Sequence, residues 1–173
     1  MNNRRSWLLI VTALAVVAAF AASAQGGTRL GVGAHYWKAL EDIELDEVDE
    51  SGVSWLASVQ LGSSALVKAQ IDVEMFPKGF VGSSDIFYAP QAFVIVGRGV
   101  YGGLGIGVYY DGEEFADDPF YLLRAGLDVE LTPKVYLDLN ANYRFEQWKN
   151  LGDVVEDIDT DVITLGAAVR LEL

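Results

Sequence analysis

The sequence predicts an all-β domain that folds as an eight-stranded antiparallel up-and-down β-barrel. Eight runs of about ten to thirteen residues alternate apolar and polar side chains with a period of two, which is the pattern of β-strands. The connections between the runs alternate between short turns and long polar segments. Strands of soluble proteins average about 5–6 residues, whereas a tilted strand that crosses a bilayer needs about 9–11. The run length therefore favours a transmembrane β-barrel.

Each run has one aliphatic face and one face that is polar, small or charged. In the seventh run, Leu137 and Leu139 alternate with Asp138 and Asn140. The fourth run is apolar on both faces, so its pattern leaves the orientation of its side chains open. The predicted strands are Thr28–Lys38, Val53–Leu61, Ala65–Phe76, Ile86–Val96, Val100–Tyr110, Phe120–Leu131, Val135–Trp148 and Thr160–Leu173.

The lengths of the connections indicate which end of the barrel is which. Bacterial outer-membrane barrels have short turns at the periplasmic end and longer loops outside. An even number of strands brings both termini to the short-turn end, so we expect periplasmic termini. The short turns are residues 62–64, 97–99 and 132–134, and the long segments are residues 39–52, 77–85, 111–119 and 149–159.

Residues 1–24 have the composition of a cleaved signal peptide. Two arginines precede the apolar run Trp7–Phe20, and Ala22 and Ala24 provide a small-residue cleavage site. The alternative is a membrane anchor, which needs about 20 apolar residues. We expect cleavage after Ala24, which leaves residues 25–173 as a single barrel domain. This domain contains no cysteine and no second long apolar run, so strands must provide any membrane span.

The charge of the chain limits the classes of partner. The formal net charge is −13, and removal of the two arginines of the signal peptide makes it −15. Such an acidic chain is unsuited to nucleic acid, whose phosphates attract basic proteins. We expect a monomer whose surroundings are outer-membrane lipid and lipopolysaccharide.

Alternation alone does not say which face points outward, because a soluble lipocalin-like barrel also alternates. Aromatic residues on the apolar faces gather at the long-loop ends of the runs, which is typical of an interfacial girdle in a membrane protein. The polar faces carry glycines such as Gly103 and Gly105, which make room in a crowded lumen. Phe87, Phe93 and Ile95 could fill that room. The predicted girdle is Tyr36, Trp55, Tyr88, Tyr110, Tyr121, Tyr143 and Phe145.

The polar faces bring both signs of charge into the predicted lumen, where unpaired charges are costly. The lumen of an eight-stranded barrel is only wide enough for its own side chains or one small ligand, so we expect it to be plugged. The predicted lumen network is Arg29, Lys68, Asp72, Glu74, Arg124, Asp128, Asp138, Arg144, Glu146 and Arg170. Because the last three runs are neighbours, its expected centre is Arg124, Asp128, Asp138, Arg144 and Arg170. The expected apolar filling is Trp37, Phe93, Tyr101, Tyr109 and Tyr136.

The last residues, Val169–Leu173, form an alternating strand that ends the chain. In this respect, and in its whole strand pattern, the chain resembles the small outer-membrane barrels of the OmpA, OmpX and OmpW type. Members of that family usually end in an aromatic residue, whereas this chain ends in Leu173. The resemblance implies a structural or permeability-related outer-membrane protein, with passage of small apolar molecules into lipid as one form of that role.

The alternative functions are an outer-membrane lipid-modifying enzyme and a soluble periplasmic binding barrel. The single histidine, His35, lies near Ser54 and Ser58 if it pairs with about residue 56. Lipid A deacylases resemble this barrel type but place histidine and serine together on a late strand, and that motif is absent. We predict no catalytic, cofactor or metal site. The acidic long segments could bind divalent cations, although a solvated surface is the simpler interpretation.

Overall fold

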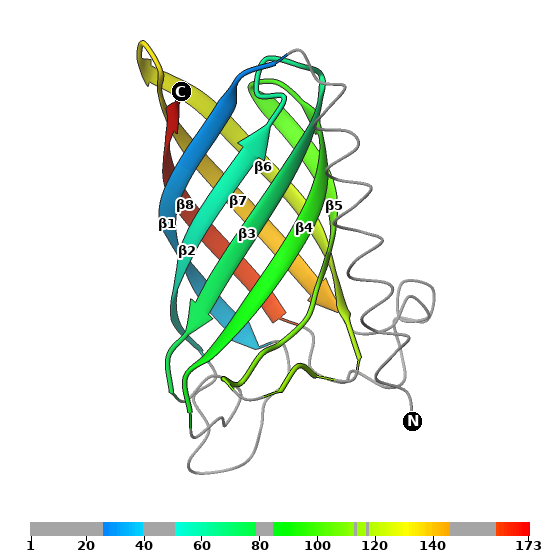
Figure 1. Cartoon of the computed structure of the whole chain (residues 1–173). Coiled ribbons are helices and arrows are strands. Elements are labelled where there is room, and N and C mark those ends of the chain that lie inside the picture. The colour runs from blue at the N-terminus through cyan, green and yellow to red at the C-terminus, as the bar shows by residue number, and fades with distance from the viewer. Residues whose placement is uncertain (1–25, 40–50, 79–84, 113, 117, 146–161) are drawn as a thin grey trace.

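The structure is a computed structural model of the 173-residue chain, and it describes residues 26–39, 51–78, 85–112, 114–116, 118–145 and 162–173. Eight antiparallel strands close into one barrel in which β8 pairs with β1 (Figure 1). This architecture confirms the predicted fold class. The strands are β1 (Thr28–Ala39), β2 (Ser51–Leu61), β3 (Val67–Phe76), β4 (Phe87–Gly97), β5 (Val100–Gly107), β6 (Phe120–Thr132), β7 (Val135–Phe145) and β8 (Val162–Glu172).

Several predictions fall on residues outside the described ranges. These are the signal peptide, most of the first, second and fourth long segments, and the parts of the seventh and eighth runs at residues 146–148 and 160–161. The described part of the chain contains no helix that is long and apolar enough to span a bilayer.

β5 ends at Gly107, three residues before the predicted end at Tyr110. The cause is Pro90 on β4. Val108 donates a hydrogen bond to the Pro90 carbonyl at 3.2 Å, but proline has no N–H to donate in return. An isolated pair between Tyr88 and Tyr110 then continues in the same register. A single proline therefore interrupts the β4–β5 ladder close to the loop end.

The register fixes the width and tilt of the barrel. Successive partners from Arg29 around the barrel lead through all eight strands to Val162, which pairs with Ala39, ten residues beyond the starting point. With a rise of about 3.3 Å per residue and strands about 4.8 Å apart, this shear tilts the strands by about 40° and gives a radius of about 8 Å. Side chains from opposite walls therefore meet in the lumen.

The outward face of the barrel is apolar between the strand ends. Val32 is 68% exposed, Leu104 55% and Leu165 58%, although all three are aliphatic. At the calculated tilt, the outward residues of β8 and the final Leu173 span about 25 Å along the barrel axis. That height matches the apolar band of an outer-membrane barrel, which is about 25 Å tall.

The short turns and both described chain ends lie at one end of the barrel. The Leu173 N–H donates to the Thr28 carbonyl at 3.0 Å, so the last residue lies beside the first strand (Figure 1). Gly62, Gly97 and Lys134 adopt positive φ values in the three turns. At Gly97 a Cβ atom would collide with the Val100 carbonyl, which makes glycine necessary there.

Candidate functional site: the barrel lumen

The lumen is the candidate site because the charged and polar side chains of the barrel are buried there. Alternation places one residue in two on the inner wall, and the closed sheet keeps these residues from water. Their contacts form three clusters, which we name by height. The loop-end layer is Glu74, Arg144, His35, Ser54 and Gln91; the middle layer is Asp72, Asp138, Arg124 and Arg170; the turn-end layer is Arg29, Lys68, Asp128 and Glu172.

Glu74 is the centre of the loop-end layer, and its side chain is 1% exposed. One carboxylate oxygen lies 2.9 Å from His35 Nδ1 and accepts a hydrogen bond from Ser54 Oγ. The other oxygen accepts from Gln91 Nε2 and from Arg144 Nη2, each at 2.9 Å. These partners come from β1, β2, β4 and β7, so one carboxylate on β3 connects five strands.

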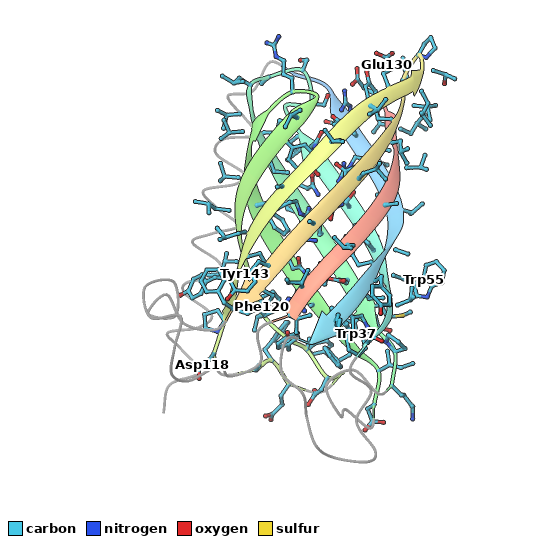
Figure 2. The ribbon with its side chains drawn as sticks, turned by 180° about the vertical axis from the view of Figure 1, so that it is seen from behind. Trp37, Trp55, Asp118, Phe120, Glu130 and Tyr143 are labelled. Atoms are coloured by element: carbon cyan, nitrogen blue, oxygen red, sulfur yellow. The ribbon has the colours of Figure 1, made fainter. Side chains whose placement is uncertain are left out.

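Aromatic rings pack beside this layer at the loop end of the barrel. The Arg144 guanidinium lies 4.5 Å from the ring centre of Phe120 and 4.9 Å from that of Phe76, and it donates to Tyr109 Oη. Phe87 stacks on Phe76 at 5.1 Å. Trp37 belongs to the same buried cluster, and Figure 2 shows Trp37 and Phe120 near the loop end. We call Trp37, Phe76, Phe87, Tyr109 and Phe120 the aromatic plug.

The middle layer consists of two ion pairs whose side chains have no exposed surface. Arg124 contacts Asp72 at 2.8 Å, and Arg170 pairs with Asp138. Tyr101 donates a hydrogen bond to Asp138 at 2.6 Å. Asparagine and glutamine side chains provide further hydrogen bonds. Gln70 donates to Asp72 and Asn140 donates to Asp138, whereas Asn142 accepts from Arg124.

Arg29 organises the turn-end layer and joins the first strand to the last. It contacts Asp128 at 2.7 Å and Glu172 at 2.9 Å. Lys68 reaches the same Asp128 oxygen at 3.4 Å. The Arg29 guanidinium also stacks on the Tyr136 ring, 3.3 Å from its centre.

Each layer is electrically balanced among the residues that the structure describes. In the loop-end layer, the carboxylate of Glu74 is matched by the guanidinium of Arg144. The middle and turn-end layers each hold two carboxylates and two cations. Paired charges with additional hydrogen bonds are the form in which ionic groups tolerate burial. The aspartate, glutamate, lysine and arginine side chains of these three described layers are therefore balanced at each height.

Glycines on the inner wall give room to large neighbours. A Cβ atom on Gly105 would collide with the Phe93 ring, and one on Gly103 would crowd Ile95. This agrees with the expected filling of the space over the fifth run. Phe93 and Tyr101 are almost fully buried, and Tyr136 is half-buried under Arg29.

The predicted centre of the charge network consisted of five residues of β6, β7 and β8, without assigned pairs. Within this group, Asp138 and Arg170 form an ion pair with each other. Arg124 and Arg144 instead contact Asp72 and Glu74 on β3, across the lumen. Proximity of strands along the chain does not identify these partners, because side chains from opposite walls of so narrow a barrel also meet. Glu146 lies outside the described residues.

The predicted aromatic girdle separates into exposed and covered members. Tyr36, Trp55 and Tyr88 are 48%, 59% and 41% exposed, and Figure 2 shows Trp55 pointing away from the barrel. Tyr110, Tyr121 and Tyr143 are half-buried. Phe145 is a correction to the prediction, because it has no exposed surface. It stacks on Tyr143 at 5.6 Å and contacts Tyr121 at 5.9 Å.

The histidine and the serines are not arranged as a catalytic pair. His35 pairs with Ser54 across β1 and β2, not with residue 56. Ser54 Oγ donates to Glu74, and the imidazole contacts the same carboxylate oxygen through Nδ1, while its Nε2 lies beside Gly166. The serine hydroxyl is therefore hydrogen-bonded to the carboxylate, whereas a Ser–His pair needs the histidine itself as the hydrogen-bond partner of the hydroxyl. Among the described residues, no group of three histidine, cysteine, aspartate or glutamate side chains could hold a metal ion.

Comparison with solved structures places the chain among transmembrane β-barrels by fold. Neisserial surface protein A, from Neisseria, is 18% identical, with 86% of this chain and all of that chain covered and a TM-score of 0.57. The N-terminal β-barrel domain of OprF from Pseudomonas aeruginosa is 11% identical, with coverages of 86% and 100% and a TM-score of 0.51. A de novo designed transmembrane β-barrel is 10% identical, with coverages of 86% and 96% and a TM-score of 0.50. No protein-family model and no curated protein matches the sequence.

Proposed function

We propose that this chain is a non-enzymatic outer-membrane barrel protein with a structural role and a lumen plugged by its own side chains. The observation that carries the proposal is the difference in polarity between the outward and inward faces of the barrel wall. The outward face is apolar on all eight strands, whereas the inward face holds charges that pair in neutral layers. A water-soluble binding barrel needs the opposite arrangement, with its apolar face around a ligand.

The orientation in the membrane follows from the two ends. Aromatic residues that face outward lie at the loop end, where Tyr36 and Trp55 would sit at the headgroups of the outer leaflet. The short turns and the described chain ends lie at the other end, which the proposal assigns to the periplasm. Lipopolysaccharide would then surround the loop end.

The geometry of the lumen favours a structural role over an enzymatic one. Ser54, His35 and Glu74 are each at most 1% exposed, so a lipid substrate has no path to them without rearrangement of the aromatic plug. Together with Gln91 and Arg144, these residues form hydrogen bonds that connect five strands, which favours a structural role. The same plug and the ion pairs fill the space that a pore would need.

Membrane fractionation tests the proposal. Expressed with its first 24 residues, the protein should appear in the outer-membrane fraction of a Gram-negative host, beginning at residue 25 by mass spectrometry. Without boiling, it should migrate on a denaturing gel as a compact folded band that boiling converts to the unfolded mobility. Recovery in the soluble periplasmic fraction would refute the proposal, and an intact Met1 would point to a membrane anchor.

A further inference from the structure

The lumen charges follow complementary orders on opposite walls. From the turn end to the loop end, β3 presents Lys68 and then Asp72 and Glu74, a cation followed by two anions. The facing wall presents Asp128, then Arg124 on β6, and Arg144 on β7. Strand β3 makes no ladder with β6 or β7, so these contacts cross the lumen. The facing pairs are Lys68 with Asp128 at 3.4 Å, Asp72 with Arg124 at 2.8 Å and Glu74 with Arg144 at 2.9 Å.

The apolar pattern alone does not fix the register of such a barrel. A slip of one residue turns every side chain to the wrong face and is excluded. A slip of two residues keeps every aliphatic residue outward, because the pattern has a period of two. The outward faces of β6 and β7 are aliphatic at nearly every position, so lipid would accept either register.

The charges oppose such a slip. In the native register, Arg124 lies opposite Asn142 and Asp128 opposite Asp138, and each aspartate has its own cation, Arg29 or Arg170. A slip of two residues between β6 and β7 in one direction places Arg124 opposite Arg144. A slip in the other direction brings no like charges together, but it shifts Arg124 against Arg144, so that Asp72 and Glu74 on β3 can no longer pair with both. Between β1 and β8, a slip of two residues in one direction places Arg29 opposite Arg170, where Glu172 is the native partner. Like charges directly opposite each other are destabilising, and burial increases the penalty.

We propose that the buried charges act as a register device, which fixes the height at which opposite walls of the barrel meet. In this role the order of the charges along β3 and β6 matters, and not only their total. Two pairs, Lys68 with Asp128 and Asp72 with Arg124, have the same spacing of four residues on both strands. They can therefore be exchanged as blocks without any change in composition.

The experiment uses three variants of the whole chain, all with wild-type composition. One exchanges the β3 charges (Lys68→Asp with Asp72→Lys), another exchanges the β6 charges (Arg124→Asp with Asp128→Arg), and the third combines both exchanges. Each single exchange sets like charges against each other in two layers, whereas the combined variant restores opposite charges between positions 68 and 128 and between positions 72 and 124. Each layer then again holds two cations and two carboxylates, with Glu172 as the remaining carboxylate partner of Arg29. A control exchanges the exposed pair Glu130 and Lys134.

The measured quantity is the fraction of each variant that refolds in detergent micelles, which is determined from heat-dependent gel mobility. Each single exchange should lower the refolded fraction at least tenfold, and the combined variant should recover at least half of the wild-type fraction. The control should refold like the wild type. The proposal is overturned if the combined variant refolds no better than the single exchanges, or if the single exchanges refold normally.

A cysteine crosslink reads the register directly, because the chain has no cysteine of its own. Ala125→Cys with Ala141→Cys should form a disulfide in the native register, since these outward residues are direct partners on β6 and β7. Ala125→Cys with Tyr143→Cys reports the slipped register. Material that folds after the β6 exchange should lose the first crosslink and gain the second, because the carboxylate placed at position 124 would then lie opposite Arg144. Retention of the native crosslink at the wild-type yield would overturn the proposal.

Discussion

Glu74 shows how a single side chain can bind several strands together. Its two oxygens receive four hydrogen bonds from four other strands, and its arginine partner lies against the aromatic plug. Such a buried carboxylate is stable only while its partners remain. The energetic consequences of single substitutions should therefore depend on what is left unpaired.

Replacement of Arg144 with methionine should lower the free energy of unfolding by about 3–5 kcal/mol, because Glu74 would lose its charged partner while remaining buried. Addition of Glu74→Gln to the same protein should restore a large part of this loss, because no lone charge remains. Urea unfolding in micelles, followed by tryptophan fluorescence, measures both values. A double variant that is less stable than Arg144→Met alone would contradict the neutral-layer interpretation.

Gly105 offers a steric test on the inner wall. Substitution of alanine there should cost about 1–3 kcal/mol, because the added methyl group would overlap the Phe93 ring. Phe93→Leu in the same chain should relieve the overlap and recover stability. Gly102→Ala on the same strand is the matched control, since a Cβ there meets only one atom at 3.8 Å. Equal losses at both glycines would show that strand propensity, and not packing, sets the cost.

At this scale the sequence predicted which residues face inward but not which ones touch. Alternation placed Lys68, Glu74 and Asp138 on the inner wall, because a strand allows only two faces. The partners depend on the radius and shear, which no single strand encodes. The amide side chains of Gln91 and Asn142 were missed for a related reason: their only signal was an inward position on their strands.

At the scale of the strand, the outward faces of β5 and β7 should tolerate charge only near their ends. Leu104→Arg and Leu139→Arg, in the middle of the apolar band, should each cost about 2–4 kcal/mol in a bilayer refolding assay. Leu131→Arg, next to a short turn, should cost about 0–1 kcal/mol. If all three substitutions cost the same, the assignment of this face to lipid would be wrong.

Strand ends were predicted less well than strand existence, and β5 explains why. Its alternation continues to Tyr110, yet the ladder is interrupted at Pro90 on the neighbouring strand. A proline interrupts the ladder with the neighbouring strand to which its backbone nitrogen points. Period-two alternation does not predict which of the two neighbouring strands this is. Phe145 is a second example. Alternation predicted that it lies on the outward face, but not that the rings of Tyr121 and Tyr143 pack against it.

The first long segment provides a test of the acidic loops. Residues 41–50 carry seven carboxylates, and the hypothesis is that they bind divalent cations weakly. Neutralisation of these residues to their amides should reduce the increase in melting temperature that millimolar calcium gives the wild type. An unchanged calcium response would leave the segment as a solvated surface.

For the whole molecule, the proposed plugging of the lumen predicts that the protein does not conduct ions. The refolded wild type in a planar bilayer should show no steady conductance of porin size, because paired side chains and the aromatic plug occupy the lumen. Arg144→Ala, which removes a side chain between the plug and Glu74, should give brief openings. Steady porin-like current through the wild-type protein would exclude the plugged lumen.

The neutrality of each layer has a consequence for the response to voltage. A membrane potential acts on a buried charge with about 2.3 kcal/mol per elementary charge per 100 mV. In this lumen, each described cation lies at the same height as an anion, so the field pulls the two members of a pair in opposite directions and does almost no net work on the layer. The described layers of the lumen therefore contain no unbalanced aspartate, glutamate, lysine or arginine that could act as a gating charge, and this part of the barrel should be as stable across a polarised bilayer as across an unpolarised one.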